Sequence, residues 1–141
     1  MPPASPRVRW IGSAIGVGAG YFLIGVILGA IADADTTIAG RNRWRLAAWI
    51  VSGLVFAAQI AYDRTRLRHS IGTASLHAAT AAAVGGFLLA VAATIHKMNV
   101  GTVDARYLLA LVLWPLAVAV PAFAAALVLS AIIRPRNGQI L

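Results

Sequence analysis

Four long apolar stretches, separated by short polar connections, dominate the pattern of this chain. A run of about 20 residues in a helix, rising about 1.5 Å per residue, crosses a hydrocarbon core of about 30 Å. None of the four shows the short alternation of polar and apolar residues typical of outer-membrane strands. The pattern therefore predicts an all-α integral membrane protein, a four-span transmembrane helical bundle, with spans at residues 10–32, 46–62, 70–95 and 107–133.

Composition supports this class and leaves little room for anything else. Hydrophobic residues make up 60% of the chain and charged residues 11%, against roughly 45–50% and 25% in soluble domains. We expect one transmembrane domain over residues 1–141, without a soluble catalytic domain. Cysteine and glutamate are absent, and the four aspartates are expected in the connections: Asp33, Asp35, Asp63 and Asp104. A carboxylate buried among the spans is therefore not expected.

The basic residues decide the expected orientation. An even number of spans places both termini on one side, and cytoplasmic termini put seven basic residues inside and five outside. The positive-inside rule favours that orientation. The preference for Arg, Ala and Gly, which have GC-rich codons, indicates a bacterial protein, and hence the cytoplasmic (inner) membrane. A signal peptide cut after Ala32 is the alternative for the first span, although its apolar run exceeds the usual 7–15 residues.

Glycines recur every fourth residue along the first span. Small residues at this spacing let helix backbones approach closely, which favours association where the solvent is itself apolar. We therefore predict a helix-packing face, within the protomer or between protomers, at Gly12, Gly16, Gly20, Gly25 and Gly29.

His77 is the only ionisable residue placed well inside a predicted span. Thr73, His77 and Thr80 lie on one face of the third span, and Ser52 and Gln59 on one face of the second. Antiparallel packing around a turn near Arg66 would bring Gln59 level with Thr73 and Ser52 level with Thr80. The expectation is a polar seam that joins the two helices, with His77 between these levels.

A satisfied interhelical histidine is the first interpretation of His77, and a site for a lipid head group, ion or substrate is the second. Metal or haem ligation needs partners at the same depth on other helices. His69 and His96 lie at opposite ends of the third span, so neither is expected to assist His77. No metal, cofactor or catalytic residue is therefore predicted.

Two further features concern the shape of the bundle and its contact with lipid. Pro115 and Pro121 each remove a backbone donor from the fourth span, which predicts kinks. Arg64, Arg66 and Arg68 form one of several short arginine clusters beside the spans. Guanidinium groups suit lipid phosphate and help to fix topology.

The function class follows from what these features can do. Small-residue packing faces without buried charge favour a non-enzymatic accessory or assembly protein that contacts lipid. Its expected partners are membrane lipids, further copies of itself or a larger membrane complex. Nucleic acid is not expected, because the basic residues flank apolar runs. The alternative is a small oligomeric channel or transporter for an anion or neutral solute, based on the polar seam and the prolines.

Overall fold

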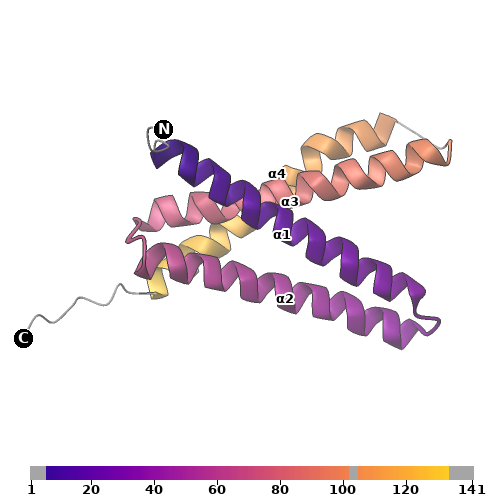
Figure 1. The fold of residues 1–141 in the computed structure, drawn as a ribbon, viewed down its shortest axis with the longest axis horizontal. Helices are drawn as coiled ribbons and strands as arrows, with labels where there is room; N and C mark the ends of the chain where they lie inside the picture. The colour runs from indigo at the N-terminus through magenta and orange to yellow at the C-terminus, as the bar shows by residue number, and fades with distance from the viewer. Residues whose placement is uncertain (1–5, 102–104, 134–141) are drawn as a thin grey trace, which may run out of the picture.

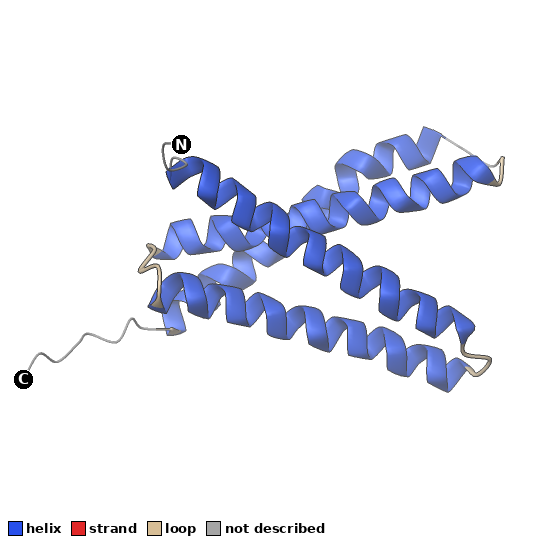
Figure 2. Ribbon diagram, viewed as in Figure 1, coloured by secondary structure: helices blue, strands red, loops and turns tan. Residues whose placement is uncertain are grey.

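Four helices account for nearly all of the described chain (Figures 1 and 2). The computed structural model describes residues 6–101 and 105–133, and of residues 6–9 and 105 it describes the backbone alone. Each helix is long and apolar enough to span a membrane. Asp104 lies outside the described residues. The helices are α1 (Pro6–Ala34), α2 (Ile38–Thr65), α3 (Ile71–Asn99) and α4 (Ala105–Ile132).

The connection between α1 and α2 is only three residues long, Asp35–Thr37. Thr37 caps α2, because its hydroxyl accepts a hydrogen bond from the Gly40 backbone N–H at 3.0 Å. The helix therefore begins at Ile38, well before the predicted start at residue 46. The first turns of the helix therefore carry the three arginines that precede the predicted span, Arg41, Arg43 and Arg45. The capping threonine, by accepting an N–H of the first turn, stabilises a helix start at this earlier position.

The helices form two pairs that cross each other. Figure 1 shows α1 beside α2, and α3 beside α4, with α1 crossing over α3 near the centre. The start of α1, the end of α4 and the turn from α2 to α3 lie at one end, which we call the closed end. At the other end the pairs diverge. A small apolar cluster of Ile60, Ala78 and Ala126 joins α2, α3 and α4 toward the closed end.

Glycine does allow the close crossing of α1 and α3, and the tightest approaches are at Gly18 and Gly85, which are not among the predicted positions. A Cβ atom added to Gly18 would lie 2.6 Å from Val84 Cβ, and one added to Gly85 would lie 2.9 Å from Tyr21 Cβ. Of the predicted glycines only Gly25 faces a neighbouring side chain, Leu89 at 3.3 Å. The other four have open space around them in this protomer: Gly12, Gly16, Gly20 and Gly29.

The fourth helix is continuous through both of its prolines. Pro115 and Pro121 lie inside α4, which the structure assigns as helix from Ala105 to Ile132. Proline has no backbone N–H to donate to the carbonyl four residues earlier. The carbonyls of Leu111 and Ala117 therefore lose their helical donors. The prolines therefore remove the usual helical donors of two carbonyls in α4 without ending the helix.

Candidate functional site

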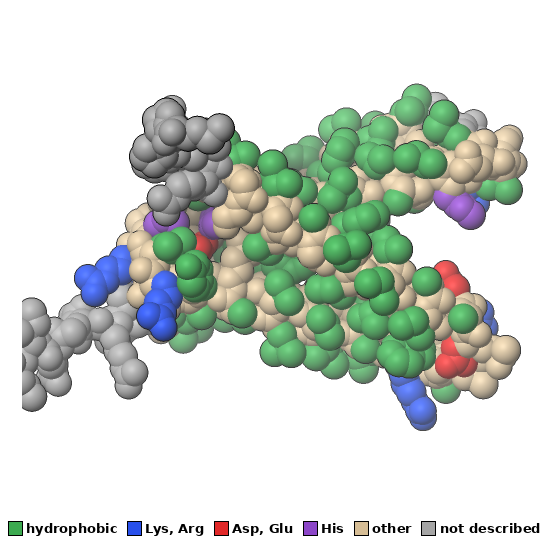
Figure 3. Space-filling model, in the orientation of Figure 1, with side chains coloured by type: hydrophobic (Ala, Val, Ile, Leu, Met, Phe, Trp, Pro, Cys, Tyr) green, Lys and Arg blue, Asp and Glu red, His purple; other side chains and the backbone are tan. Residues whose placement is uncertain are grey.

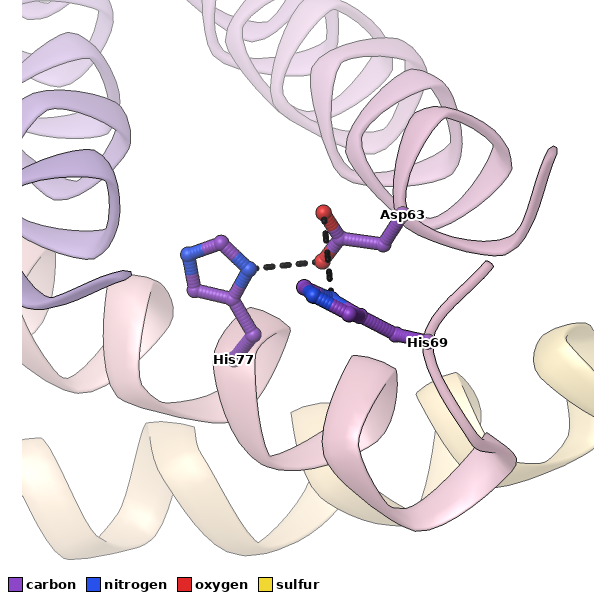
Figure 4. Close-up of side chains that lie close together, drawn as sticks. All are labelled: Asp63, His69 and His77. Atoms are coloured by element: carbon purple, nitrogen blue, oxygen red, sulfur yellow. Dashed lines mark hydrogen bonds and ion pairs between the residues drawn. The ribbon is translucent and has the colours of Figure 1, made fainter. Parts of the chain in front are cut away.

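The main polar feature is a buried carboxylate–histidine pair near the closed end. Asp63 is 1% exposed and His77 is 2% exposed. The Asp63 Oδ2 atom lies 2.6 Å from His77 Nδ1 (Figure 4). The expectation that every aspartate lies in a connection is wrong for Asp63, because α2 continues to Thr65 and places this residue in its last turn. His77, in the second turn of α3, therefore has a carboxylate partner. The expectation is also wrong for Asp33, which lies in the last turn of α1.

His69 joins this pair because of how the chain turns after α2. The backbone N–H groups of Arg66 and Leu67 both donate to the Tyr62 carbonyl, at 2.9 and 3.2 Å. Arg68 has a φ of +52°, in the left-handed region that side chains rarely adopt. The chain then reverses direction, and the His69 backbone N–H donates to the Asp63 carbonyl at 3.0 Å.

The reversal places the His69 side chain over Asp63. Its Nδ1 atom lies 4.0 Å from Asp63 Oδ1, and Figure 4 shows both imidazoles beside the one carboxylate. The expectation that His69 cannot assist His77 is therefore wrong. His69 lies in the connection that precedes α3, and this connection folds back onto the helix. One ligand atom from each of Asp63, His69 and His77 lies within 4.8 Å of the others.

Arg64 holds this end of the bundle together. Its Nε donates to the Ser130 carbonyl on α4 at 3.1 Å, and one terminal nitrogen donates to the His69 carbonyl at 2.7 Å. One guanidinium thus links α2, the turn and α4. Among the predicted lipid-contacting arginines, Arg66 and Arg68 are exposed, whereas Arg64 is partly buried and binds these two carbonyls.

The first helix covers the outer side of His77. The Trp10 and His77 rings are 5.5 Å apart between centroids, at an interplanar angle of 33°. Three nitrogens of the cluster are buried without a hydrogen-bond partner among the described residues: Trp10 Nε1, His69 Nδ1 and His77 Nε2. The cluster thus contains both an anionic acceptor and uncommitted nitrogen atoms. In a dry site the carboxylate and the imidazole nitrogens are suited to binding a cation or to holding a proton.

The predicted polar seam is not the arrangement that the structure shows. The Thr80 hydroxyl donates to the Leu76 carbonyl on its own helix, and the Thr73 hydroxyl bonds to Ser70. Gln59 accepts a hydrogen bond from the Tyr21 hydroxyl of α1 at 3.4 Å. α2 and α3 are joined near the closed end by the contact between Asp63 and His77. Beyond the turn that connects them the two helices diverge (Figure 1).

A signal for Asp63 was nevertheless present in the sequence. Ser52, Gln59 and Asp63 are spaced i, i+7 and i+11, so the polar face of α2 continues into its last turn. Because Asp63 comes directly before a run of arginines, it was assigned to the connection. No comparable signal exists for His69, since its position depends on the reversal at Arg68.

A cavity of about 540 Å³ lies among the four helices, away from the cluster. Tyr21 and Gly25 of α1 and Gly85 and Leu89 of α3 line one part of it. Side chains of α2 and α4 complete the walls, among them Trp49, Ser52, Phe56, Trp114 and Pro121. The cavity is therefore largely apolar, with few hydroxyl groups.

No protein family matches this chain, and comparisons with curated proteins and with solved structures gave no match either. Any function must accordingly be argued from the cluster, the cavity and the surface.

Proposed function

We propose that this chain is a multi-pass protein of a bacterial inner membrane, a non-enzymatic accessory protein that works through contacts with lipids and other helices. The carrying observation is the apolar cavity of about 540 Å³ among four helices long enough to span a membrane. Its proposed occupant is an acyl chain of an anionic phospholipid.

The outer surface supports insertion into a membrane. Large apolar side chains are exposed along the helices, including Trp49 at 79% and Val120 at 68%. Figure 3 shows apolar side chains over the middle of the bundle and charged ones near its ends. Water would solvate such a surface poorly, whereas hydrocarbon matches it.

One face of α2 connects the cavity to two arginines. Arg41, Arg45, Trp49, Ser52 and Phe56 recur at intervals of three or four residues and share this face. Arg45 has a side chain that is 63% exposed. Phe56 lies about 16 Å along the helix from Arg45, close to half of a hydrocarbon core of about 30 Å. A phosphate at the arginines would thus place its acyl chain beside the cavity.

The test measures lipid bound to the purified full chain by native mass spectrometry, with phosphatidylglycerol compared to phosphatidylcholine. We expect preferential binding of phosphatidylglycerol. Arg45→Gln should weaken it about fivefold, since a basic residue at a membrane surface contributes about 1 kcal/mol. Arg43→Gln is the matched control, because it removes the same charge from a different side of α2.

A second pair of variants tests the cavity itself. Gly53 lines it, and a Cβ added there meets nothing within 4 Å. Gly53→Leu should therefore fill the cavity without a clash and reduce lipid retention. Leu54→Phe, at a side chain that is 65% exposed, is the control and should retain lipid. Equal retention by both variants, or equal binding of the two lipids, would contradict the proposal.

The proposed orientation, with cytoplasmic termini, can be tested directly because the chain has no cysteine. Thr36 lies in the connection between α1 and α2, and Thr65 ends α2 at the closed end. In intact cells a membrane-impermeant maleimide should label Thr36→Cys and leave Thr65→Cys unlabelled until the cells are lysed. The reverse pattern would invert the orientation, and chain in the soluble fraction would exclude insertion.

Transport of an anion or neutral solute is the second candidate function. The supporting observation is that Ala117, whose carbonyl loses its helical donor to Pro121, lines the same cavity. Freed carbonyls can contact a solute where a helix borders a cavity. Proteoliposomes that show no flux of chloride, phosphate or glycerol above protein-free vesicles would exclude these solutes and favour the accessory role.

A further inference from the structure

We infer that Asp63, His69 and His77 form a binding site for a divalent transition-metal ion of the zinc type. This goes beyond the proposed lipid contacts, since the cluster is separate from the cavity. The inference rests on three features: the ligand atoms converge, two of the three side chains are buried, and a ring nitrogen within the cluster lacks a partner.

The donor set suits the metal. One carboxylate oxygen and two imidazole nitrogens are ligands typical of zinc sites that leave a fourth position open. Imidazole nitrogen also selects against Ca²⁺ and Mg²⁺, which prefer oxygen. The chain supplies this set from three different places, the end of α2, the turn and the second turn of α3.

The distances require only small side-chain movements. Ligand atoms around a tetrahedral zinc ion, with bonds of about 2.0–2.1 Å, are separated by about 3.3 Å. The separation of 2.6 Å between His77 Nδ1 and Asp63 Oδ2 would open to this value. His69 Nδ1, which lies 4.0 Å from the other carboxylate oxygen, Oδ1, would move toward the shared ion, and one ligand atom from each residue already lies within 4.8 Å of the others. The backbone hydrogen bond from His69 to the Asp63 carbonyl already holds these two residues together.

The hydrogen-bonding state of the cluster is also compatible with metal binding. His69 Nδ1 is buried without a hydrogen-bond partner in the described part of the chain, so its lone pair can bind a cation without breaking a hydrogen bond. In the neutral tautomer of His77 that donates from Nδ1 to Asp63, metal binding would move this proton to Nε2, which has no hydrogen-bond partner among the described residues. The ring stays neutral while Nδ1 becomes a ligand, so no net proton is lost at this residue.

Charge and access favour the same site. The described ion-pair partners of Asp63 are the two histidines, while Arg64 binds two carbonyl oxygens. The carboxylate is therefore not neutralised by an arginine within ion-pair distance. The His69 side chain is 29% exposed, whereas that of Asp63 is 2% exposed, so an ion can reach the cluster past His69.

The experiment titrates the full chain, purified in mild detergent without a polyhistidine tag, with Zn²⁺ by isothermal calorimetry. We expect one ion per chain. Titration with Co²⁺ supplies a second readout, because a four-coordinate Co²⁺ site absorbs visible light far more strongly than the hydrated ion does. This spectrum would come from the wild-type chain and does not depend on whether variants fold.

Two single variants and one control assign the site. His69→Ala and Asp63→Asn should each weaken Zn²⁺ binding by about a hundredfold, because even an outer partner of a metal ligand contributes 10- to 100-fold. His69→Ala alters an accessible side chain and is the variant more certain to fold. His96→Ala is the control, since this exposed histidine lies at the other end of α3.

Three results would overturn the inference. The first is wild-type binding no tighter than that of His69→Ala. The second is a Co²⁺ spectrum of the hydrated ion alone, and the third is loss of binding in His96→Ala with retention in His69→Ala. Lipid binding is measured separately, so failure of the metal site leaves the proposed accessory role standing, and failure of lipid binding leaves the metal site standing.

Discussion

The carboxylate of Asp63 lies 2.6 Å from Nδ1 of His77, and both side chains are almost completely buried. This contact joins the last turn of α2 to the second turn of α3, close to where the two helices are linked by a reversed turn. Trp10 of α1 covers the imidazole, and Arg64 ties the same end to α4. Side chains beside this polar pair thus link all four helices at the closed end.

Removing either member of this pair should destabilise the fold. Breaking a buried ion or hydrogen-bonded pair by deleting one partner costs about 3–5 kcal/mol, because the other partner stays desolvated. We expect Asp63→Ala and His77→Ala each to lower the free energy of unfolding, measured by reversible unfolding in mixed micelles. Asp33→Ala, which removes a carboxylate that is 78% exposed, should change it by less than about 0.5 kcal/mol.

The double variant tests whether the two residues act as a pair. Contacting residues show interaction energies of about 0.5–3 kcal/mol in a double-mutant cycle. Asp63→Ala combined with His77→Ala should therefore cost less than the sum of the single variants. If the free-energy changes of the two single variants simply added in the double variant, Asp63 and His77 would not be energetically coupled.

The crossing of α1 and α3 should depend on Gly18 and not on the glycines at every fourth position. A Cβ at Gly18 would lie 2.6 Å from Val84 Cβ and 2.8 Å from the Ala81 carbonyl oxygen. Overpacking of this kind costs about 1–3 kcal/mol. Gly18→Ala should therefore unfold at a lower denaturant concentration than the wild-type chain. Gly16→Ala, with nothing within 4 Å of its Cβ, is the control and should match or exceed wild-type stability. Equal loss in both variants would place the crossing elsewhere.

Arg64 should not be replaceable by lysine. Its guanidinium donates to the Ser130 and His69 carbonyls at once, through two nitrogens of a planar group. Lysine keeps the charge but has a single ammonium, and hydrogen bonds from charged donors contribute about 1.5–3 kcal/mol. Arg64→Lys should therefore lose about 1.5 kcal/mol of unfolding free energy, while the exposed Arg66→Lys loses little. Thermal unfolding of Arg64→Lys and Arg66→Lys, each compared with the wild-type chain, measures this difference in stability.

The connection between α1 and α2 should show a pH dependence from Asp35. The Thr37 backbone N–H, then its hydroxyl, hold the pKa of this carboxyl below its ordinary value of 3.8, and Arg41 and Arg43 act in the same direction. Because the folded pKa is the lower one, the stabilising contribution is present above pH 3.8 and is lost as pH falls through the folded pKa.

Carboxyl chemical shifts during an NMR titration in micelles measure this pKa. Thr37→Ala removes the hydroxyl that donates at 2.8 Å but keeps the backbone donor at 2.9 Å, so the pKa should move part of the way toward 3.8. Thr36→Ala, at the neighbouring exposed residue, is the control and should leave the pKa of Asp35 lowered. A normal Asp35 pKa in wild type would contradict the structure of this turn.

How far the sequence predicts the site can be judged from individual residues. His77 was identified because an ionisable side chain within an apolar run costs free energy unless it is satisfied. The polar face of α2 was also visible, at Ser52 and Gln59. Asp63 was missed because a residue beside an arginine cluster is assigned to a connection when the helix end is uncertain. His69 was missed because its position depends on the reversal at Arg68.

The sequence by itself determined the number of helices, their approximate extents and their apolar character. These properties depend on composition and run length, which are local. Only the tertiary structure decided which glycines allow the close crossing, which polar groups become partners and that His69 lies against Asp63. Those outcomes depend on the angle between helix pairs and on a single left-handed residue, Arg68, in the turn. Neither has a periodic signature, because each arises from packing between segments distant in the chain.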